Sequence, residues 1–170
     1  MRKCLITFLA LVLGLSMSAQ IQNKILGFTL GSTSKTTVYN YLKTNHIKFI
    51  KEENGEYCAE KVKFAGTLWE FVWFTFYDGK LYNVDFSLSD YSTPVQTMDL
   101  IYKRLDNTLI SKYARYYDYD KSTNERKLYS DNVTQISFTY RYFQGSKSLG
   151  IMYTYLPLFN SKQSSDADEL

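Results

Sequence analysis

The segment Gly31–Thr37, GSTSKTT, comes closest in this chain to a phosphate-binding loop. It has a glycine, several hydroxyl side chains and Lys35, which are the residue types that hold a phosphate at the start of a helix. A loop of that kind also needs glycines where Thr29 and Ser34 stand, because backbone amides must wrap the phosphate. We therefore interpret Ser34 as the cap of a helix and not as part of a nucleotide site.

A second candidate is the acidic run DYDKSTNERKLY, which starts at Asp118. Its oxygen-bearing side chains alternate as they do in a calcium loop. However, Thr123 stands at the position that requires glycine, and Tyr129 stands at the position of the final bidentate acid. We expect a solvated connection between strands here, without a metal.

The third candidate is a nucleophile pair formed by Cys58 and His46, the one histidine in the sequence. Two such ligands are too few for a structural zinc site. A cysteine next to strand residues is more often a small buried apolar group than a nucleophile. We therefore expect no catalytic residue, no cofactor and no metal, and an enzyme using Cys58 and His46 remains the third alternative.

The N-terminus has the pattern of a secretory signal peptide. Arg2 and Lys3 precede an apolar run over residues 5–15, and small residues follow. We assign the signal peptide to residues 1–19, with cleavage after Ser18 as the alternative. The mature protein is expected to be periplasmic or secreted by a bacterium, with no stable membrane span after cleavage.

Charge and cysteine content restrict the mature protein further. Loss of the signal peptide removes two basic residues, so the net charge falls from +3 to +1. This leaves no basic field for nucleic acid. Only Cys58 remains, so no internal disulfide can form and the fold must rest on its apolar core.

The pattern of the mature chain predicts an α+β fold, an antiparallel sheet with two helices on one face. One helix is expected over Lys35–Thr44, and a second is opened by Thr93 and Pro94, with Thr93 and Gln96 as a capping box. Each helix precedes strands, which gives a single domain over 20–157 with a tandem repeat of helix and strands over 25–89 and 93–156. The polar tail, 158–170, is expected to be disordered. Strands are expected at 25–30, 47–51, 57–64, 67–77, 80–88, 113–119, 133–143 and 149–156.

The pair Asp78–Gly79 predicts a hairpin, and two registers remain open. A two-residue turn places Trp73 opposite Val84. A three-residue bulged turn shifts the pairing by one residue and places Val72 opposite Val84.

The sequence holds 16 Tyr and 11 Phe, more than one small core can enclose. We therefore expect some rings on an open, aromatic-rich face of the sheet that binds a partner. The candidate partner-binding residues are Trp69, Trp73, Tyr82, Tyr140, Tyr142, Tyr153 and Tyr155.

The stretch LGFTLGSTSKTTVYNYLKTN resembles the start of the SmpA/OmlA-like lipoproteins and of the β-lactamase-inhibitor-protein-like domains. The residues that carry the likeness are Gly31, Ser34, Val38 and Leu42, and FYDGKLYNVDF is similar to a strand hairpin of these families. The chain lacks the lipid-bearing cysteine of the lipoproteins. The resemblance implies non-enzymatic binding through the sheet.

Taken together, these patterns lead us to expect an exported, non-enzymatic binding module. Its partner would be a protein of the cell envelope, bound in the manner of an inhibitor or an assembly factor. The alternative is a carbohydrate- or cell-wall-binding protein that uses exposed Tyr and Trp.

Overall fold

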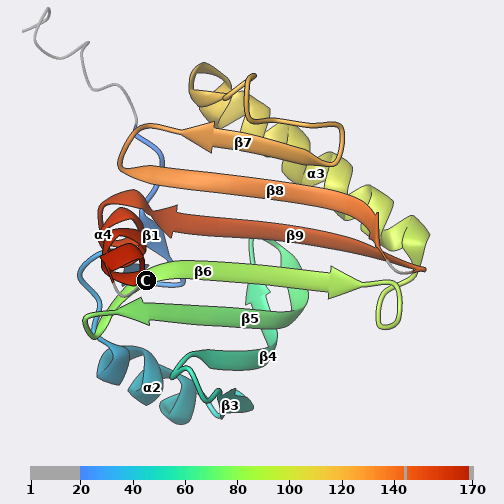
Figure 1. Cartoon of the computed structure of the whole chain (residues 1–170). Coiled ribbons are helices and arrows are strands. Elements are labelled where there is room, and N and C mark those ends of the chain that lie inside the picture. The colour runs from blue at the N-terminus through green and yellow to red at the C-terminus, as the bar shows by residue number, and fades with distance from the viewer. Residues whose placement is uncertain (1–19, 144, 169–170) are drawn as a thin grey trace, which may run out of the picture.

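The computed structural model describes residues 20–143 and 145–168, so the predicted signal peptide, 1–19, lies outside the described residues. Within this part the chain folds as α+β, with a seven-stranded sheet and a separate two-stranded one (Figure 1). The elements are β1 (Lys24–Ile25), β2 (Phe28–Thr29), α2 (Lys35–Thr44), β3 (Phe49–Lys51), β4 (Tyr57–Phe64), β5 (Thr67–Tyr77), β6 (Lys80–Ser89), α3 (Val95–Tyr113), a 3-10 turn (Ala114–Tyr116), β7 (Arg126–Ser130), β8 (Thr134–Phe143), β9 (Ser146–Tyr155) and α4 (Leu156–Asp168).

The large sheet has the order β3-β4-β5-β6-β9-β8-β7 and is antiparallel throughout. A helix followed by strands occurs twice, as predicted, first as α2 with β3–β6 and then as α3 with β7–β9. The two units meet where their last strands pair, with Phe86 of β6 opposite Ile151 of β9. One continuous sheet results, with its midline between β6 and β9.

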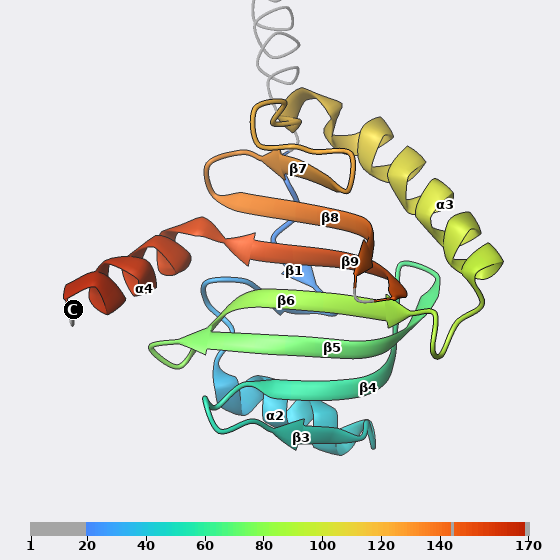
Figure 2. The same ribbon diagram turned by 45° about the vertical axis from the view of Figure 1, so that its right-hand side comes forward.

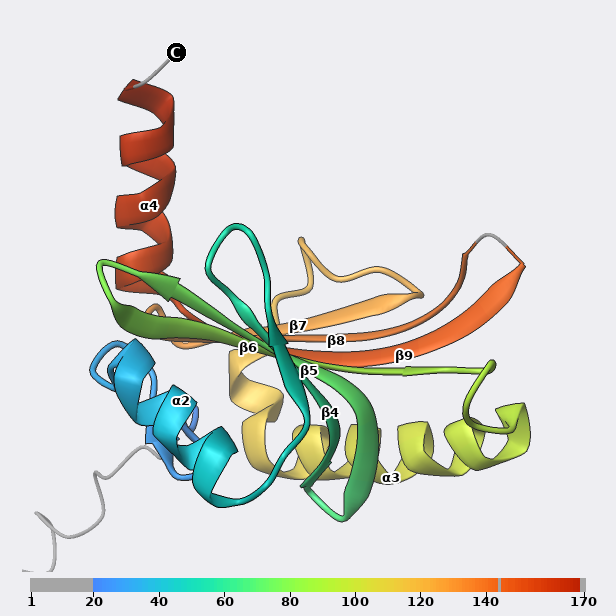
Figure 3. The ribbon, with the colours of Figure 1, turned by 90° about the horizontal axis from the view of Figure 1, so that it is seen from below.

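Two helices cover one face of this sheet and leave the other face open. In Figure 3 the sheet is seen edge-on, with α2 and α3 below it, while α4 rises from the opposite side. Figure 2 shows that α4 projects outward from the end of β9 and does not lie across the strands. None of the helices in the described residues is long and apolar enough to cross a bilayer.

The core lies between the sheet and the two covering helices. Alternate residues of the central strands point to this side, because side chains of a strand alternate between faces. The fully or almost fully buried residues include Val38 and Leu42 of α2, Met98, Leu105 and Leu109 of α3, Val84, Phe86 and Leu88 of β6, Ile136 and Phe138 of β8, and Leu149 and Ile151 of β9.

The start of α2 follows the prediction, and the start of α3 does not. Ser34 caps α2, since its Oγ accepts a hydrogen bond from the Thr37 amide at 3.1 Å. At α3 the N-cap is Pro94, without a side-chain cap, so the predicted capping box is wrong. The amides of Thr97 and Met98 donate instead to the Pro94 carbonyl, which satisfies part of the first turn.

The β5–β6 hairpin has neither of the two predicted registers. Asp78 and Gly79, both with positive φ, form the expected two-residue turn, and Tyr77 pairs with Lys80. A β-bulge at Tyr82 then inserts one extra residue into β6 and shifts every later pair. Trp73 consequently lies opposite Asp85, a residue of the open face, and not opposite Val84.

Other segments also depart from the prediction. Residues 113–119 were expected to form a strand, but Tyr113 ends α3 and a 3-10 turn follows. The strand of this region lies later, at Arg126–Ser130, and pairs with β8. The expected disordered tail from 158 is instead the helix α4, which continues directly from β9 and packs Phe159 near Tyr82.

Candidate functional site

The open face of the large sheet is the candidate functional surface. Its members follow from the pairing, because residues directly opposite on neighbouring antiparallel strands point to the same side. We use the name open face for Cys58, Phe71, Trp73, Thr75, Asn83, Asp85, Ser87, Gln135, Ser137, Thr139, Arg141, Ser148, Gly150, Met152 and Thr154.

The composition of this face corrects the expectation of an aromatic-rich surface. Its centre, on β6, β8 and β9, carries mainly Ser, Thr, Asn and Gln side chains, and its rings are Phe71 and Trp73 of β5. The two rings lie 5.6 Å apart between centroids. The sequence of β6 could have predicted this polar face, because Asn83, Asp85 and Ser87 alternate there with apolar residues.

The seven predicted partner-binding residues do not form one patch. Trp69 and Tyr153 are buried on the helix side, at 0% and 7% exposure, so they are not available to a partner. Tyr140 and Tyr155 also point to the helix side and are half-buried. The other members are Tyr142, which is exposed at the β8–β9 turn, and Trp73 and Tyr82, which lie on the open side of the sheet.

Tyr82 is itself covered, because the ring of Phe159 in α4 lies 6.4 Å from its ring, and its exposure is 7%. Tyr142 stands apart at the far end of β8, where its hydroxyl donates to the Gly145 carbonyl. Trp73 is therefore the predicted residue that presents a half-buried ring on the open face.

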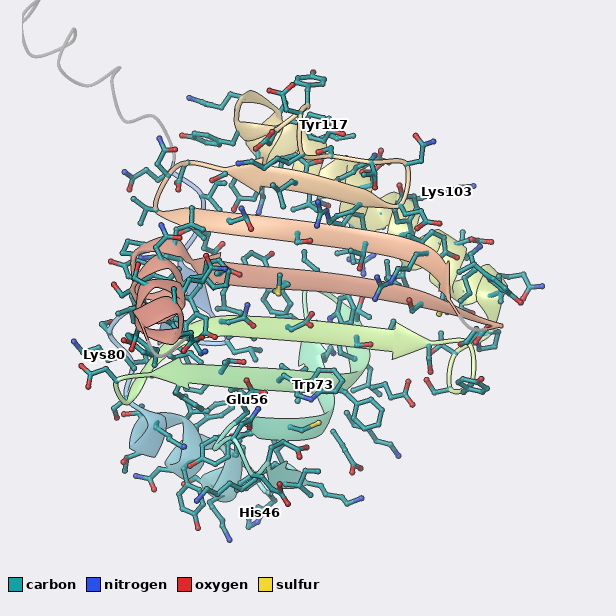
Figure 4. The ribbon with its side chains drawn as sticks, in the orientation of Figure 1. His46, Glu56, Trp73, Lys80, Lys103 and Tyr117 are labelled. Atoms are coloured by element: carbon teal, nitrogen blue, oxygen red, sulfur yellow. The ribbon has the colours of Figure 1, made fainter. Side chains whose placement is uncertain are left out.

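A hollow of about 480 Å³ opens beside Trp73. Its other lining residues come from the β3–β4 turn and are Glu52, Glu53, Asn54 and Glu56. Figure 4 shows Glu56 and Trp73 next to each other on the side of the sheet that faces the viewer. Three glutamates thus line the hollow together with one indole ring, and the lining contains no lysine or arginine.

Local hydrogen bonds hold the acidic turn in place. The Glu52 amide donates to the Glu56 carbonyl and the Gly55 amide donates to the Glu52 carbonyl, at 3.0 and 2.9 Å. The Glu56 amide donates to Asn54 Oδ1. Gly55, with φ of +83°, supplies the left-handed conformation that closes the turn. The three glutamates are therefore attached to a defined backbone shape, although the sequence showed them only as part of a turn.

Asp85 adds a further carboxyl group at the middle of the open face. It lies opposite Trp73 on one side and Met152 on the other. Burial raises the pKa of Asp85 to about 6, and the positive charge of Arg141 partly offsets this increase. Trp73 thus has carboxyl groups on two sides, Asp85 on β6 and the three glutamates of the β3–β4 turn.

The surroundings of Cys58 do not favour the nucleophilic form of its thiol. Burial, helped by Glu52 and Glu60, raises the pKa of the Cys58 thiol to about 11, which disfavours the nucleophilic thiolate. His46 lies in the turn after α2, at the lower edge of Figure 4, and no hydrogen bond between it and Cys58 occurs in the described residues.

The calcium-like segment forms a compact turn. Asp118 Oδ1 accepts a hydrogen bond from the Lys121 amide, and Oδ2 lies 3.4 Å from Lys121 Nζ. Over residues 20–143 and 145–168, no group of three or more His, Cys, Asp or Glu side chains is placed to hold a metal ion.

No family model, curated protein or solved structure matches this chain. The resemblance to the SmpA/OmlA-like lipoproteins and the β-lactamase-inhibitor-protein-like domains therefore stays a prediction from the sequence.

Proposed function

We propose that this protein is an exported, non-enzymatic binding module of the bacterial envelope, and that its open face binds a protein partner through a basic side chain. The observation that carries the proposal is the half-buried ring of Trp73 beside three glutamates and a hollow of about 480 Å³. The resemblance described above supports binding through the sheet.

The chemistry of the hollow favours a cation. The face of an indole ring attracts Lys and Arg more strongly than other aromatic rings do, and such a contact contributes about 0.5–2 kcal/mol. Carboxylates of Glu52, Glu53 and Glu56 add ion pairs that strengthen as the partner excludes water. A Lys or Arg of the partner would lie over Trp73 with its charged end among these carboxylates.

The rest of the open face suits a broad protein contact. Ser87, Gly150 and Thr139 are neighbours across three strands, so the partner can approach the backbone closely. Asp85 offers a second attachment point for a donor. Polar side chains of this kind form the rim of a protein interface around an aromatic anchor.

The proposal is tested by capture of partners from envelope extract on immobilised protein that begins at Gln20. Wild type, Trp73→Ala and the triple variant Glu52→Gln/Glu53→Gln/Glu56→Gln are compared by quantitative mass spectrometry. The matched control is Leu68→Ala, which removes a 60% exposed side chain from the same strand. The expected result is a protein retained by wild type and by Leu68→Ala and lost from both site variants.

The captured protein is then purified and its affinity measured at several salt concentrations. Loss of an interface tryptophan should cost about 2 kcal/mol, or roughly 30-fold in Kd. Wild-type binding should weaken with salt, and the triple variant should show a smaller salt dependence. Unchanged capture by Trp73→Ala would refute the assignment of this face. Export is checked separately by sequencing the N-terminus of the protein found outside the cytoplasm.

A further inference from the structure

A second pocket lies on the helix side of the sheet, away from the open face. It has a volume of about 240 Å³ and is situated at the edge where the end of α3 meets β7. Figure 4 labels one of its members, Tyr117, at this edge. The lining residues are Ile110, Ala114, Tyr117, Tyr119, Lys127 and Tyr129.

The pocket contains a polar group without a partner. Tyr129 is 0% exposed, and its hydroxyl has no hydrogen-bond partner among the described residues. A buried hydroxyl in this state costs roughly 1–3 kcal/mol. The ring cannot turn away freely, because Tyr117 packs edge-on against it at 5.3 Å and pairs with it as an isolated bridge. The hydroxyl is covered in this structure, so an oxygen atom of a ligand satisfies it only after the covering side chains shift.

The mouth of the pocket offers apolar surface for a ring. Tyr119 is 82% exposed and lies edge-on to Tyr117 at 4.6 Å, and Ile110 is 47% exposed. Exposed tyrosine rings at a pocket provide flat apolar faces with a polar end. They suit a ligand that has both a C–H face and oxygen atoms.

The charged neighbours indicate that the ligand is neutral and rich in hydroxyl groups. Lys127 Nζ is paired with Asp106 Oδ1 at 2.6 Å, so the pair as a whole carries no net charge. It still offers a donor and an acceptor near Tyr129, whose pKa both residues influence. A hydroxyl group can donate to one member and accept from the other, which a purely aromatic molecule cannot do.

We propose that this pocket binds an uncharged pyranose sugar unit, with its C–H face on Tyr119 and Tyr117 and a hydroxyl on Tyr129. The site is independent of the protein-binding role proposed for the open face. The pocket admits one sugar ring, which could be a free monosaccharide or one unit of a glycan chain.

Glucose, galactose and N-acetylglucosamine are tested as probes at millimolar concentration by saturation-transfer NMR, with phenol as the aromatic comparison. We expect saturation of the ring protons of at least one sugar. Tyr129→Phe keeps the ring and removes only the unpaired hydroxyl, so the variant should fold at least as stably as wild type while binding about tenfold more weakly. Tyr119→Ala should weaken binding several-fold through loss of stacking.

The matched control is Tyr91→Ala, which removes an 84% exposed tyrosine in the loop before α3, and Trp73→Ala separates the pocket from the open face. Both should bind the sugar as wild type does. The proposal is overturned if no sugar is saturated, if phenol alone binds, or if Tyr129→Phe binds as tightly as wild type. Sugar binding lost with Trp73→Ala but kept by Tyr129→Phe would move the site to the open face.

Discussion

The ring of Tyr155 fills the space in which a side chain at Gly31 would begin. A Cβ atom built on Gly31 would lie 2.5 Å from Tyr155 Cε1 and 2.8 Å from Cζ. This contact joins the loop before α2 to the end of β9, the last strand of the sheet. The glycine that first suggested a phosphate loop is therefore explained by packing.

Replacement of Gly31 by alanine should destabilise the protein for two reasons. The backbone of Gly31 has φ of +83°, and the new methyl group would strike the Tyr155 ring. We expect a loss of about 2–4 kcal/mol in the free energy of unfolding, measured with urea. Gly27→Ala is the matched control, since Gly27 has φ of +86° with nothing within 4 Å of the new atom, and it should cost about 1 kcal/mol. Equal losses of stability in the two variants would show that the Tyr155 ring moves aside without a cost in free energy.

The stability of the protein should depend on the ionisation of Asp85. Its pKa is about 6 in the folded protein and 3.8 as the ordinary value, so the folded state binds this proton more readily. The contribution of Asp85 to the free energy of unfolding is most favourable below a pH of about 4 and is lost as the pH rises through 6. Asp85→Asn should therefore raise the free energy of unfolding at pH 8 by about 1–2 kcal/mol, after a discount for partial exposure. The variant's free energy of unfolding should also change less with pH between pH 4 and pH 8.

This profile is measured by urea unfolding between pH 4 and pH 8. The control is Asp120→Asn, which neutralises an exposed carboxyl group in the loop before β7. It should leave the slope between pH 4 and pH 6 as in wild type. A parallel change in both variants would indicate a general charge effect and would contradict the role assigned to Asp85.

Arg104 should be needed to hold α3 against the β4–β5 turn. Its two terminal guanidinium nitrogens, Nη1 and Nη2, donate to the Ala65 carbonyl at 2.7 Å and to Thr67 Oγ1 at 2.6 Å. Lysine has a single ammonium group and cannot donate to both acceptors in this geometry. Arg104→Lys should therefore lower the free energy of unfolding by about 1 kcal/mol and leave the buried Thr67 hydroxyl less well satisfied. Thermal unfolding measures the effect. The control is Lys103→Ala, a change at the exposed neighbouring residue, which should alter the free energy of unfolding by less than about 0.5 kcal/mol.

The thiol of Cys58 should react slowly in the native protein. With a pKa of about 11 little thiolate is present at pH 7, and alkylation by iodoacetamide should accelerate about tenfold per pH unit up to pH 10. Urea-unfolded protein should react more than about 100-fold faster at pH 7, because the thiol then regains its ordinary pKa. The measurement uses protein from Gln20 onward, which has no second cysteine. Rapid native alkylation at pH 7 would restore the case for a nucleophile.

The sequence predicted correctly those features that depend on neighbouring residues alone, a helix cap and a tight turn. Ser34 caps α2 with its own side chain, and Asp78–Gly79 makes a two-residue turn through its own backbone, so both could be read from neighbouring residues. The bulge at Tyr82 could not, because β5 is apolar on both faces and tolerates several registers. Its position decides that Asp85 lies opposite Trp73 on the open face.

The candidate sites depend still more on tertiary contacts. Trp69 and Trp73 are equivalent in the sequence, yet one is fully buried under the helices and the other lies on the open face. The three glutamates of the β3–β4 turn meet Trp73 only after β4 has paired with β5. The pocket at Tyr129 requires α3 to lie beside β7, a strand that the sequence did not predict.

The pairing of β6 with β9 also determines the order in which this protein can fold. Synthesis delivers the chain from its N-terminus, so β6 emerges with β5 as its neighbour while β9 is still to come. During that interval the inner edge of β6 has unpaired amides and carbonyls, which invite pairing with other chains. Closure of the sheet at its midline is thus a late event between distant segments, and such contacts form slowly. A chain with this topology avoids mispairing of β6 if it stays unfolded until β9 has been synthesised.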